Sequence, residues 1–547
     1  MAASAPVPHC CARCALRLAG VRDVRAYTQE LPTDDPAAAD CPDLDIAVHL
    51  AAVPECDSWG DGEEAAGEGE EAEPGAGGAM GAAAPRTADE AAATAADGGS
   101  VCALSLCPLC LGLLQVGART PTVRRLCVGV RECGFSIGSF AMTATIPPSL
   151  IARQRAAWLH ARRPVADGAT APAVARRYDE VTDLKEVFRW LLSGAIAAEL
   201  GVPFDALSPL TLAVSADHAL TADEHVAALG PYAPDAPRAS KRARGRRAAR
   251  ADEDAGVMSV RGVTRAMATT GADDALRASP LCPPPPAASP PRVTLAVEHA
   301  AHCMGGKYVK HSRVLPQTAW VIDGKRKCEG SVQEMIDAPA IDLFRASSAR
   351  FHSAGREDVD VRMLGEGRPF VLELIGPKAP NQTAEAYAEL AAEIRRRSGG
   401  VVEVSELGPV PISMIATLIK AGEDAHRKDY RCVVRASRTL TADDVALLNG
   451  TRELQLDQLT PLRVLHRRTL AVRPRTIHAM TARLIGPRFM QLDLTTQAGT
   501  YVKEFVHGDF GRTAPSVGSL LGCHVDIVQL DVLGLHAAPG EVPGAGA

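Results

Sequence analysis

The chain has few aromatic residues and no long apolar run. Aromatic residues make up 4% of its 547 residues, whereas 46% are hydrophobic and 23% are charged, a balance that is ordinary for a globular protein. No stretch approaches the roughly 18 uninterrupted apolar residues that a membrane-spanning helix needs. We find neither a Walker phosphate loop nor a convincing dinucleotide-binding glycine turn. These absences argue against a membrane protein and against an enzyme that depends on a bound nucleotide.

The first ten residues also lack two kinds of targeting signal. They have neither the basic flank of a secretory signal nor the arginine-rich pattern of a transit peptide. We therefore expect a soluble protein of the nucleus, the cytoplasm or both. A chain of 547 residues exceeds what a single hydrophobic core usually organises, so two or more domains are expected.

Low-complexity sequence divides the chain. The formal net charge is −6, but nine acidic residues and no Lys or Arg lie between residues 55 and 73, so the rest of the chain is net basic. The insert 57–98 cannot bury enough apolar surface to fold, and we expect it to be a disordered loop within an N-terminal domain of residues 1–232. The basic and Pro-rich tract 233–292 is interpreted as a linker, and residues 293–540 as the second domain.

Local patterns predict helices and strands in both domains. Helices and strands alternate in the N-terminal part, which suggests an α/β module, and strands interleave with helices in the second domain, which suits an α+β core. Capping residues, glycine stops and alternating apolar residues support four elements in particular. These are a helix at 184–200, a strand at 210–214, a helix around 387–394 and a helix from 441 to 450.

Two Cys-x-x-Cys pairs predict a metal site. Cys11 and Cys14 form one pair, and Cys107 and Cys110 form the other, with Cys10 as a spare candidate. Four thiolates in tetrahedral geometry are the ligand set of structural zinc, and a long intervening loop adds little closure entropy because that cost grows only logarithmically. Buried free thiols or a redox pair are the alternatives. With no open ligand position implied, the zinc would stabilise the fold and would not catalyse.

The segment 355–378 is the most informative about function. Alternating apolar residues on either side of 365–367 predict a hairpin, which places Asp358 at the mouth of a strand, on rigid backbone that a substrate could reach. The alternative is a solvated turn with surface ion pairs among its four charged residues, Arg356, Glu357, Asp358 and Asp360.

The Gly-Arg-x-Asp element at 355–358 resembles the catalytic signature of pseudouridine synthases. The surrounding stretch is similar to the archaeal and eukaryotic tRNA pseudouridine synthases, the tenth family, which act on uridines 54 and 55 of the T-loop. Residues 428–431, Lys-Asp-Tyr-Arg, resemble the second motif of that family, and residues 499–513 resemble its third. Similar segments at 307–317 and 460–468 extend the resemblance over nearly all of the second domain.

The resemblance implies three catalytic residues. Asp358 would be the essential carboxylate, acting as a nucleophile or as the base that promotes a glycal intermediate. Lys503, expected on a strand, would pair with it, because a nearby cation opposes protonation of a carboxylate in a dry pocket. Tyr430 would stack on the uracil, and its hydroxyl could relay the C5 proton. Without the resemblance, a half-buried core tyrosine and a surface lysine are the simpler interpretations of these last two residues.

The resemblance also implies the fold and the partners. The catalytic domain would be α+β with a mixed, mainly antiparallel sheet, and the N-terminal α/β domain would hold the zinc and a THUMP-like RNA-binding fold. The substrate would be the T-arm of tRNA, with other structured RNAs as further candidates, and the chain would act as a monomer. No organic cofactor is needed, because the isomerisation consumes no external group.

Basic residues are expected to bind the RNA. The run 241–250 holds six of them, and it would be a nuclear-import signal, an RNA-tethering arm or a plain solvated run. Arg356 would fill the space left by the flipped base or bind a phosphate, or else pair with Glu357 or Asp360. Residues 463–468 are expected on a strand, where they cannot all meet one phosphate track, whereas Arg473 and Arg475 share a face. The remaining RNA-binding candidates are Arg463, Arg467, Arg468, Arg473, Arg475 and Arg512.

Two other functions fit parts of the sequence. The first is a non-catalytic, zinc-containing RNA adaptor in RNA processing, against which the combination of Asp358, Tyr430 and Lys503 argues. The second is another tRNA-modifying enzyme with a THUMP-like module, such as a methyltransferase, against which the missing glycine-rich cofactor loop argues.

Overall fold

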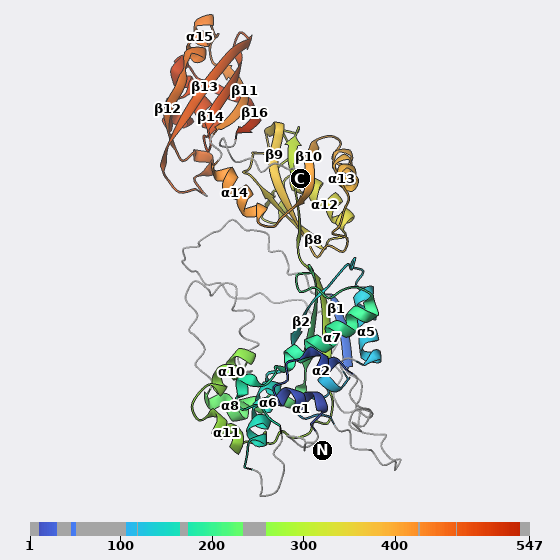
Figure 1. Ribbon diagram of the computed structural model, residues 1–547. Coiled ribbons are helices and arrows are strands. Elements are labelled where there is room, and N and C mark those ends of the chain that lie inside the picture. Colours follow the sequence, from blue (N-terminus) through green and yellow to red (C-terminus); the bar gives the residue numbers. More distant parts are fainter. Residues whose placement is uncertain are drawn as a thin grey trace, which may run out of the picture. The chain divides into compact units, whose positions relative to one another are not determined.

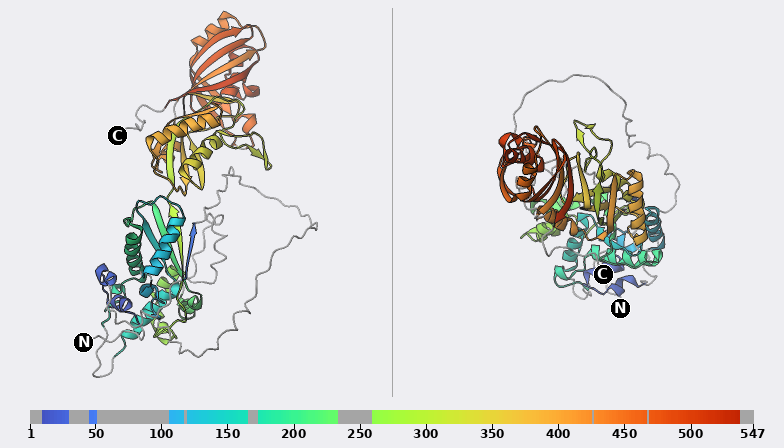
Figure 2. Two further views of the ribbon diagram at one scale, coloured as in Figure 1. Left: turned by 90° about the vertical axis from the view of Figure 1, so that its right-hand side faces the viewer. Right: turned by 90° about the horizontal axis from the view of Figure 1, so that it is seen from above.

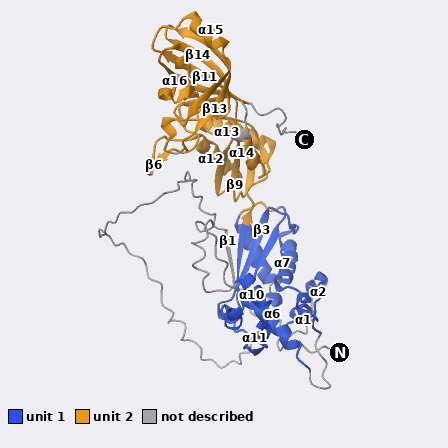
Figure 3. Ribbon diagram, turned by 90° about the vertical axis from the view of Figure 1, so that its left-hand side faces the viewer, with its two compact units in different colours: residues 1–133, 138–297 blue, residues 134–137, 298–547 orange. Residues whose placement is uncertain are grey.

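The structure is a computed structural model of the chain (Figures 1 and 2). It forms two compact units, one of Met1–Cys133 with Gly138–Val297 and one of Gly134–Ile137 with Glu298–Ala547 (Figure 3). The residues that the structure describes are 10–29, 45–50, 106–116, 119–164, 173–232, 259–424, 427–466 and 468–536. The acidic insert 57–98 and the basic run 241–250 lie outside them.

The first unit contains a four-stranded sheet in the order β1-β4-β3-β2. Strand β1 pairs in parallel with β4, and β2 pairs in parallel with β3. Helix α5 contacts β1 and α7, and α7 contacts β2. The bounds are β1 Asp45–Leu50, β2 Ala141–Thr145, β3 Leu210–Asp217, β4 Arg292–His299, α1 Ala12–Leu18, α2 Val24–Thr28, α4 Leu113–Val116, α5 Thr120–Glu132 and α7 Leu184–Leu200.

Two elements of this unit were predicted from local patterns and are confirmed. Helix α7 begins after Asp183, whose carboxylate accepts hydrogen bonds from the first helical N–H groups, and ends at Gly201, which has a left-handed φ of 74°. Strand β3 alternates buried and half-buried residues over the predicted stretch. Both predictions depended on signals that lie within a few residues of each other.

The expected linker 233–292 is partly wrong. Residues 259–292 are described, and they form helices α10 (Val260–Met267) and α11 (Ala272–Ala278) and the start of β4 within the first unit. Val263, Ala266 and Leu276 are fully buried against α6 (Pro148–Ala161) and α8 (Glu224–Leu229). The segment is rich in alanine, so its apolar helix faces are small and resemble low-complexity sequence.

The second unit is built on a ten-stranded sheet in the order β10-β5-β9-β16-β11-β14-β13-β12-β15, with β8 paired to β9. Among the described pairs only β16 with β9 is parallel, so the predicted mixed, mainly antiparallel sheet is confirmed. The bounds are β5 His302–Lys310, β8 Ser348–Ser353, β9 Val361–Ile375, β10 Val402–Val410, β11 Arg427–Ala436, β12 Arg452–Leu459, β13 Val472–Gly486, β14 Phe489–Gln497, β15 Thr513–Ala514 and β16 Val525–His536.

Helices and one small hairpin complete this unit. Helix α13 contacts β10, α15 contacts β13, and α16 contacts β16. The predicted helices around 387–394 and 441–450 are confirmed as α13 and α15, the second with a capping box between Thr441 and Asp444. The remaining bounds are β6 Val321–Ile322, β7 Lys325–Arg326, α12 Val332–Phe344, α13 Ala384–Arg397, α14 Met414–Asp424, α15 Ala442–Gly450, α16 Val502–His507 and α17 Val517–Leu521.

The predicted hairpin after Asp358 is wrong. Residues 361–375 form the single strand β9, whose first residues pair with β16 and whose later residues pair with β5 and β8. Gly365 and Gly367 have φ values of +63° and +87°, and an added Cβ would lie 1.9 Å from the Leu533 carbonyl oxygen and 2.7 Å from that of Tyr308. The glycines therefore allow a strand to bend where it changes partners, and they do not reverse the chain.

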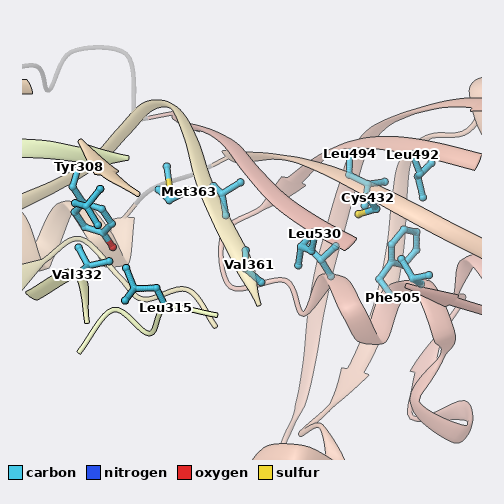
Figure 4. Close-up of a cluster of buried hydrophobic side chains, with 14 of the residues drawn as sticks. Tyr308, Leu315, Val332, Val361, Met363, Cys432, Leu492, Leu494, Phe505 and Leu530 are labelled. Atoms are coloured by element: carbon cyan, nitrogen blue, oxygen red, sulfur yellow. The ribbon is translucent and has the colours of Figure 1, made fainter. Parts of the chain in front are cut away.

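Strand β9 lies in the middle of one continuous core. Val361 and Met363 are buried, as are the residues of the strands on either side. Figure 4 shows them between two groups of buried side chains, Tyr308, Leu315 and Val332 on one side and Cys432, Leu492, Leu494, Phe505 and Leu530 on the other. The residues just before β9 are thereby held on rigid backbone.

No helix in the described parts of the chain is both long and apolar enough to span a bilayer.

Candidate active site

Asp358 stands three residues before β9, and its side chain is 40% exposed. Its Oδ2 atom lies 3.2 Å from Nζ of Lys503 and 3.2 Å from Nη1 of Arg463. Its Oδ1 atom accepts no hydrogen bond from any residue that the structure describes. Two cations therefore share one oxygen of the carboxylate, and the other oxygen is left for a ligand. The expected contact between Asp358 and Lys503 is confirmed.

Lys503 lies on helix α16. The expectation that it lies on a strand is therefore wrong. Val502, Phe505 and Val506 are buried, and their spacing of three and four residues is that of one helix face. Nζ of Lys503 also lies 2.8 Å from both carboxylate oxygens of Asp360. Burial raises the pKa of Asp360, but the hydrogen bond and charge of Lys503 outweigh it and lower that pKa.

Arg463 was expected to bind phosphate from a strand, but it lies in the short helical turn Leu462–Val464 and reaches Asp358. Its Nε donates to Oε1 of Glu504 at 2.7 Å, and Glu504 is buried. Neighbouring residues of α16 thus hold Asp358 in two ways, Lys503 directly and Glu504 through Arg463. No sequence pattern pointed to Glu504 as the partner of Arg463.

A buried lysine lies behind the backbone of Asp358. Nζ of Lys310 donates to the carbonyl oxygens of Leu315 at 2.8 Å, Asp358 at 3.1 Å and Val359 at 3.3 Å. Burial lowers the pKa of Lys310 to about 8, although the charge of Glu357 opposes the shift. Sequence reasoning missed this residue, because its role depends on contacts made 48 positions away.

The alternative of a solvated turn at 356–360 is wrong for Glu357. Its side chain is 1% exposed, and Oε2 accepts a hydrogen bond from Nε of Arg368 at 2.9 Å. The hydroxyl of Tyr308 donates to the same carboxylate at 2.9 Å, and Nε2 of Gln317 donates to the Tyr308 oxygen at 2.7 Å. Burial, with the negative charge of Glu357, raises the pKa of Tyr308 far above its usual range. This buried network anchors the residue next to Asp358.

Tyr430 lies on β11, opposite Val532 of β16, which is itself opposite Met363 of β9. Directly opposed residues point to the same face, so Tyr430 and Met363 share a face about 10 Å apart. The ring is half-buried against the core, and burial raises the pKa of Tyr430 to about 12, although the charge of Arg368 opposes the shift. No hydrogen bond joins Tyr430 to Asp358 among the described residues.

The other basic candidates divide into two groups. Arg356 and Arg468 are exposed and form no hydrogen bond or ion pair with any described residue, so the expected alternative pairing of Arg356 with Glu357 or Asp360 is absent. Arg473 donates to Oγ1 of Thr460 at 2.8 Å and Arg512 to its carbonyl oxygen at 2.6 Å, so both brace that loop. Arg475 shares a strand face of β13 with Arg473, and Arg467 lies outside the described residues.

The four predicted metal ligands come together. Cys11, Cys14, Cys107 and Cys110 are buried, and their sulfur atoms all lie within 4.8 Å of one another. Sγ of Cys11 and Sγ of Cys110 are 3.9 Å apart, close to the roughly 3.8 Å that a tetrahedral zinc with 2.3 Å bonds would impose. Cys10 is only partly buried and stands outside this group. The donor set therefore fits a structural zinc ion.

Two family models match parts of the chain. The model "Pus10, C-terminal" matches residues 303–536, and "Eukaryotic Pus10, N-terminal" matches residues 107–296. The chain belongs to the Pus10 family. The tRNA pseudouridine synthase Pus10 of Homo sapiens is 38% identical over 434 residues, which cover 78% of each chain. The Pus10 of Thermofilum pendens is 39% identical over 233 residues, which cover 42% of this chain and 52% of the relative.

Solved structures show a weaker similarity. One titled "Crystal structure of pseudouridylate synthase" is 12% identical, with a TM-score of 0.18 over 43% of this chain and 64% of that chain. The assignment to the Pus10 family rests on the sequence matches.

Proposed function

We propose that the chain is a tRNA pseudouridine synthase that isomerises uridine 54, uridine 55 or both in the T-loop. Its relatives of matching length are named tRNA pseudouridine synthases, and the human one covers 78% of each chain. The observation that carries the proposal is the placement of two cations, Lys503 and Arg463, on one oxygen of the motif carboxylate Asp358.

The reaction breaks the bond between N1 of the base and C1′ of the ribose, rotates the uracil and rejoins it through C5. The target nucleotide must leave its stack to reach a carboxylate held at a strand entrance. Lys503 and Arg463 stabilise the negative charge of Asp358 and fix its orientation, while Oδ1 stays open towards the substrate. That oxygen attacks the sugar as a nucleophile or acts as the base that promotes a glycal intermediate.

Tyr430 supplies the second part of the proposed site. Its half-buried ring offers a face on which the detached uracil can stack, a contact worth about 1–3 kcal/mol. With a pKa of about 12, the phenol is protonated at neutral pH. It can therefore accept the C5 proton only if its own hydroxyl proton passes to solvent in the same step, and N1 of the detached uracil takes up a proton from solvent.

Two exposed arginines are candidates for contacts with the RNA. The guanidinium groups of Arg356 and Arg468 are exposed and pair with no described residue, so they are suited to phosphates of the T-arm, which would contribute affinity but no sequence choice. We propose that the chain acts as a monomer, in the nucleus, the cytoplasm or both, and that its N-terminal unit is the THUMP-like RNA-binding module. The basic run 241–250 supports the nuclear assignment.

The four buried cysteines would hold a structural Zn²⁺ ion. A tetrathiolate site has no open position for substrate, so the metal would link the segment with Cys11 and Cys14 to the one with Cys107 and Cys110. No step of the isomerisation needs it, and the residues of the chain that act on the uridine lie in the second unit.

The deciding experiment compares the purified chain with its Asp358→Ala variant. Each is incubated with an unmodified tRNA transcript, and pseudouridine is detected chemically at single-nucleotide resolution. We expect product from the wild type and none from the variant, with tRNA binding retained by both. Transcripts with cytidine at position 54 or at position 55 show which uridine is converted. Equal product from both proteins would remove Asp358 from the mechanism, and no product from either would favour the RNA adaptor.

A further inference from the structure

The turn after helix α16 exposes a phenylalanine on an unusual backbone. The side chain of Phe510 is 95% exposed. Phe510 and Asp509 have positive φ angles of 57° and 45°, between Gly508 at 83° and Gly511 at 86°. Left-handed backbone is unfavourable for residues with a Cβ, and a fold keeps it only where surrounding contacts determine it. A single exposed apolar residue is ordinary, but one displayed on such a turn is not.

Contacts with the site loop fix this turn. The buried side chain of Asp509 accepts a hydrogen bond at Oδ2 from the backbone N–H of Leu462 at 3.2 Å. The backbone N–H of Leu459 donates to the carbonyl oxygen of Arg512 at 2.9 Å. The residue after Leu462 is Arg463, which contacts Asp358. The turn is therefore positioned by the same loop that reaches the proposed catalytic carboxylate.

Phe510 is also close to the site along the chain. It follows Lys503 by seven residues, and helix α16, which carries Lys503, ends at His507, three residues before Phe510. Asp509, next to Phe510, contacts Leu462, and Arg463, next to Leu462, contacts Asp358, so the turn is connected to the site by two hydrogen bonds. The segments joined by these contacts carry three partly exposed cations, Lys503, Arg463 and Arg512. Exposed aromatic rings together with basic side chains are the chemistry with which proteins bind unstacked nucleotides.

We propose that Phe510 stacks on a nucleobase of the tRNA next to the uridine held at Asp358. The proposal rests on the proposed function, because it needs a tRNA with an extruded uridine as the substrate. The strained turn then has a role, since it presents the ring towards RNA at a fixed place relative to the carboxylate. The ring would compensate for the stacking that the neighbouring base loses when the uridine leaves the loop.

The test uses the full chain with Phe510→Ala, Phe510→Trp and Phe510→Leu. We expect Phe510→Ala to raise the Kd for the unmodified transcript roughly 5- to 150-fold, the range of one base–aromatic stack. Phe510→Trp should bind as well as the wild type, and Phe510→Leu should not restore binding. Because the ring touches little in the free protein, the unfolding midpoint of Phe510→Ala should not change. Phe489→Ala, at the end of β14 away from Tyr430, is the matched control.

Two results would overturn the proposal. The first is tRNA binding by Phe510→Ala within twofold of the wild type. The second is binding by Phe510→Leu as tight as that of the wild type, which would indicate an apolar docking surface for a protein. Binding is measured in the Asp358→Ala background as well as in the wild type. The role of Phe510 is thus tested without turnover, separately from a failure of the wild type to form pseudouridine.

Discussion

Lys310 holds the main chain of Asp358 without touching its carboxylate: its buried Nζ donates to the Asp358 carbonyl oxygen at 3.1 Å. The same ammonium group donates to the carbonyl oxygens of Leu315 and Val359. An ammonium has three N–H groups, and three carbonyls accept them. Lys310 is therefore a positioning residue for the proposed catalytic acid.

Replacing this lysine should reduce catalysis more than binding. In Lys310→Met the three carbonyls, one buried and two partly buried, lose their donor, so we expect the free energy of unfolding to fall by about 1–3 kcal/mol. The loosened turn should lower the single-turnover rate constant about 10- to 100-fold, because a shift of about 1 Å in a reacting group has that effect. The rate constant is measured at saturating tRNA, the free energy of unfolding by urea titration, and the Kd for tRNA by a binding titration. Lys307→Met on the same strand is the control, and a change confined to Kd would contradict the assignment.

The pH dependence of activity should carry the signature of Lys310. Burial lowers its pKa to about 8, so above that pH the group loses one N–H and the turn loses a contact. We expect the rate constant to fall above about pH 8. Lys428 also has a pKa of about 8, through burial and then the charge of Arg368, so the assignment requires that the fall be absent in Lys310→Met.

The stability effect of the same group has the opposite direction. The ordinary pKa of lysine is 10.5, so between about pH 8 and 10.5 the unfolded chain binds more protons at Lys310 than the folded chain. The contribution of Lys310 to stability therefore rises with pH in that window. If melting curves showed instead that the wild type but not Lys310→Met loses stability there, unfolding would explain the lost activity.

Local signals predicted those parts of the fold that depend on neighbouring residues. The cap of α7 at Asp183 and the capping box of α15 at Thr441 each involve contacts over three residues. All residues of each cap are therefore visible in a short stretch of sequence. The Cys-x-x-Cys pairs are of the same kind, since each pair is two ligands of one turn. The contact of Asp358 with Lys503 came from the family motifs and not from local pattern.

Partners far apart in the sequence could not be predicted. Apolar and polar residues alternate around Gly365 in the same way for a hairpin and for a strand that changes partners. Only the pairing of β9 with β16 and β5 distinguishes the two structures. Arg463 looked like a phosphate ligand because nothing local shows that it reaches Asp358 and Glu504. Lys503 was expected on a strand although its neighbours have the spacing of a helix face.

The buried pair of Glu357 and Arg368 should be important for stability. Both side chains are at most 4% exposed, and their separation is 2.9 Å. We expect Arg368→Met to lower the free energy of unfolding by about 3–5 kcal/mol, because it leaves an unpaired buried carboxylate. The double variant Glu357→Gln with Arg368→Met should recover part of that loss in a denaturant titration. Independent, additive losses would contradict a coupled pair, and Arg350→Met, with a partly exposed arginine, is the control.

The two cations that contact Asp358, Lys503 and Arg463, should contribute unequally to the rate constant. Lys503→Met removes a direct contact, and we expect the single-turnover rate constant to fall about 100- to 1000-fold, with partial recovery in Lys503→Arg. Arg463→Met should have a smaller effect, and Glu504→Gln should reproduce it, because Glu504 orients Arg463. The double variant of Arg463 and Glu504 should then be no worse than Arg463→Met.

A control separates this role from RNA binding. Arg468 is exposed and unpaired among the described residues, so Arg468→Met should weaken tRNA binding and leave the rate at saturating tRNA unchanged. If Arg463→Met behaved in the same way, Arg463 would be a phosphate ligand, as the sequence first suggested.

The cysteine cluster should bind zinc more tightly because of a buried arginine. Four thiolates around Zn²⁺ carry two net negative charges, and Nη1 of the fully buried Arg17 lies 3.5 Å from Sγ of Cys14. Arg17 is itself held by the carbonyl oxygen of Thr182 and by Gln154. We expect Arg17→Leu to lower zinc affinity about 10- to 100-fold in a chelator competition, and Cys14→Ser to lose stoichiometric metal. Arg25→Leu, on the exposed side of α2, should keep wild-type affinity. Equal zinc affinities in Arg17→Leu and Arg25→Leu would show that the charge of Arg17 does not act on the metal. If the metal-free wild type had an unchanged melting temperature, zinc would have no role in stabilising the fold.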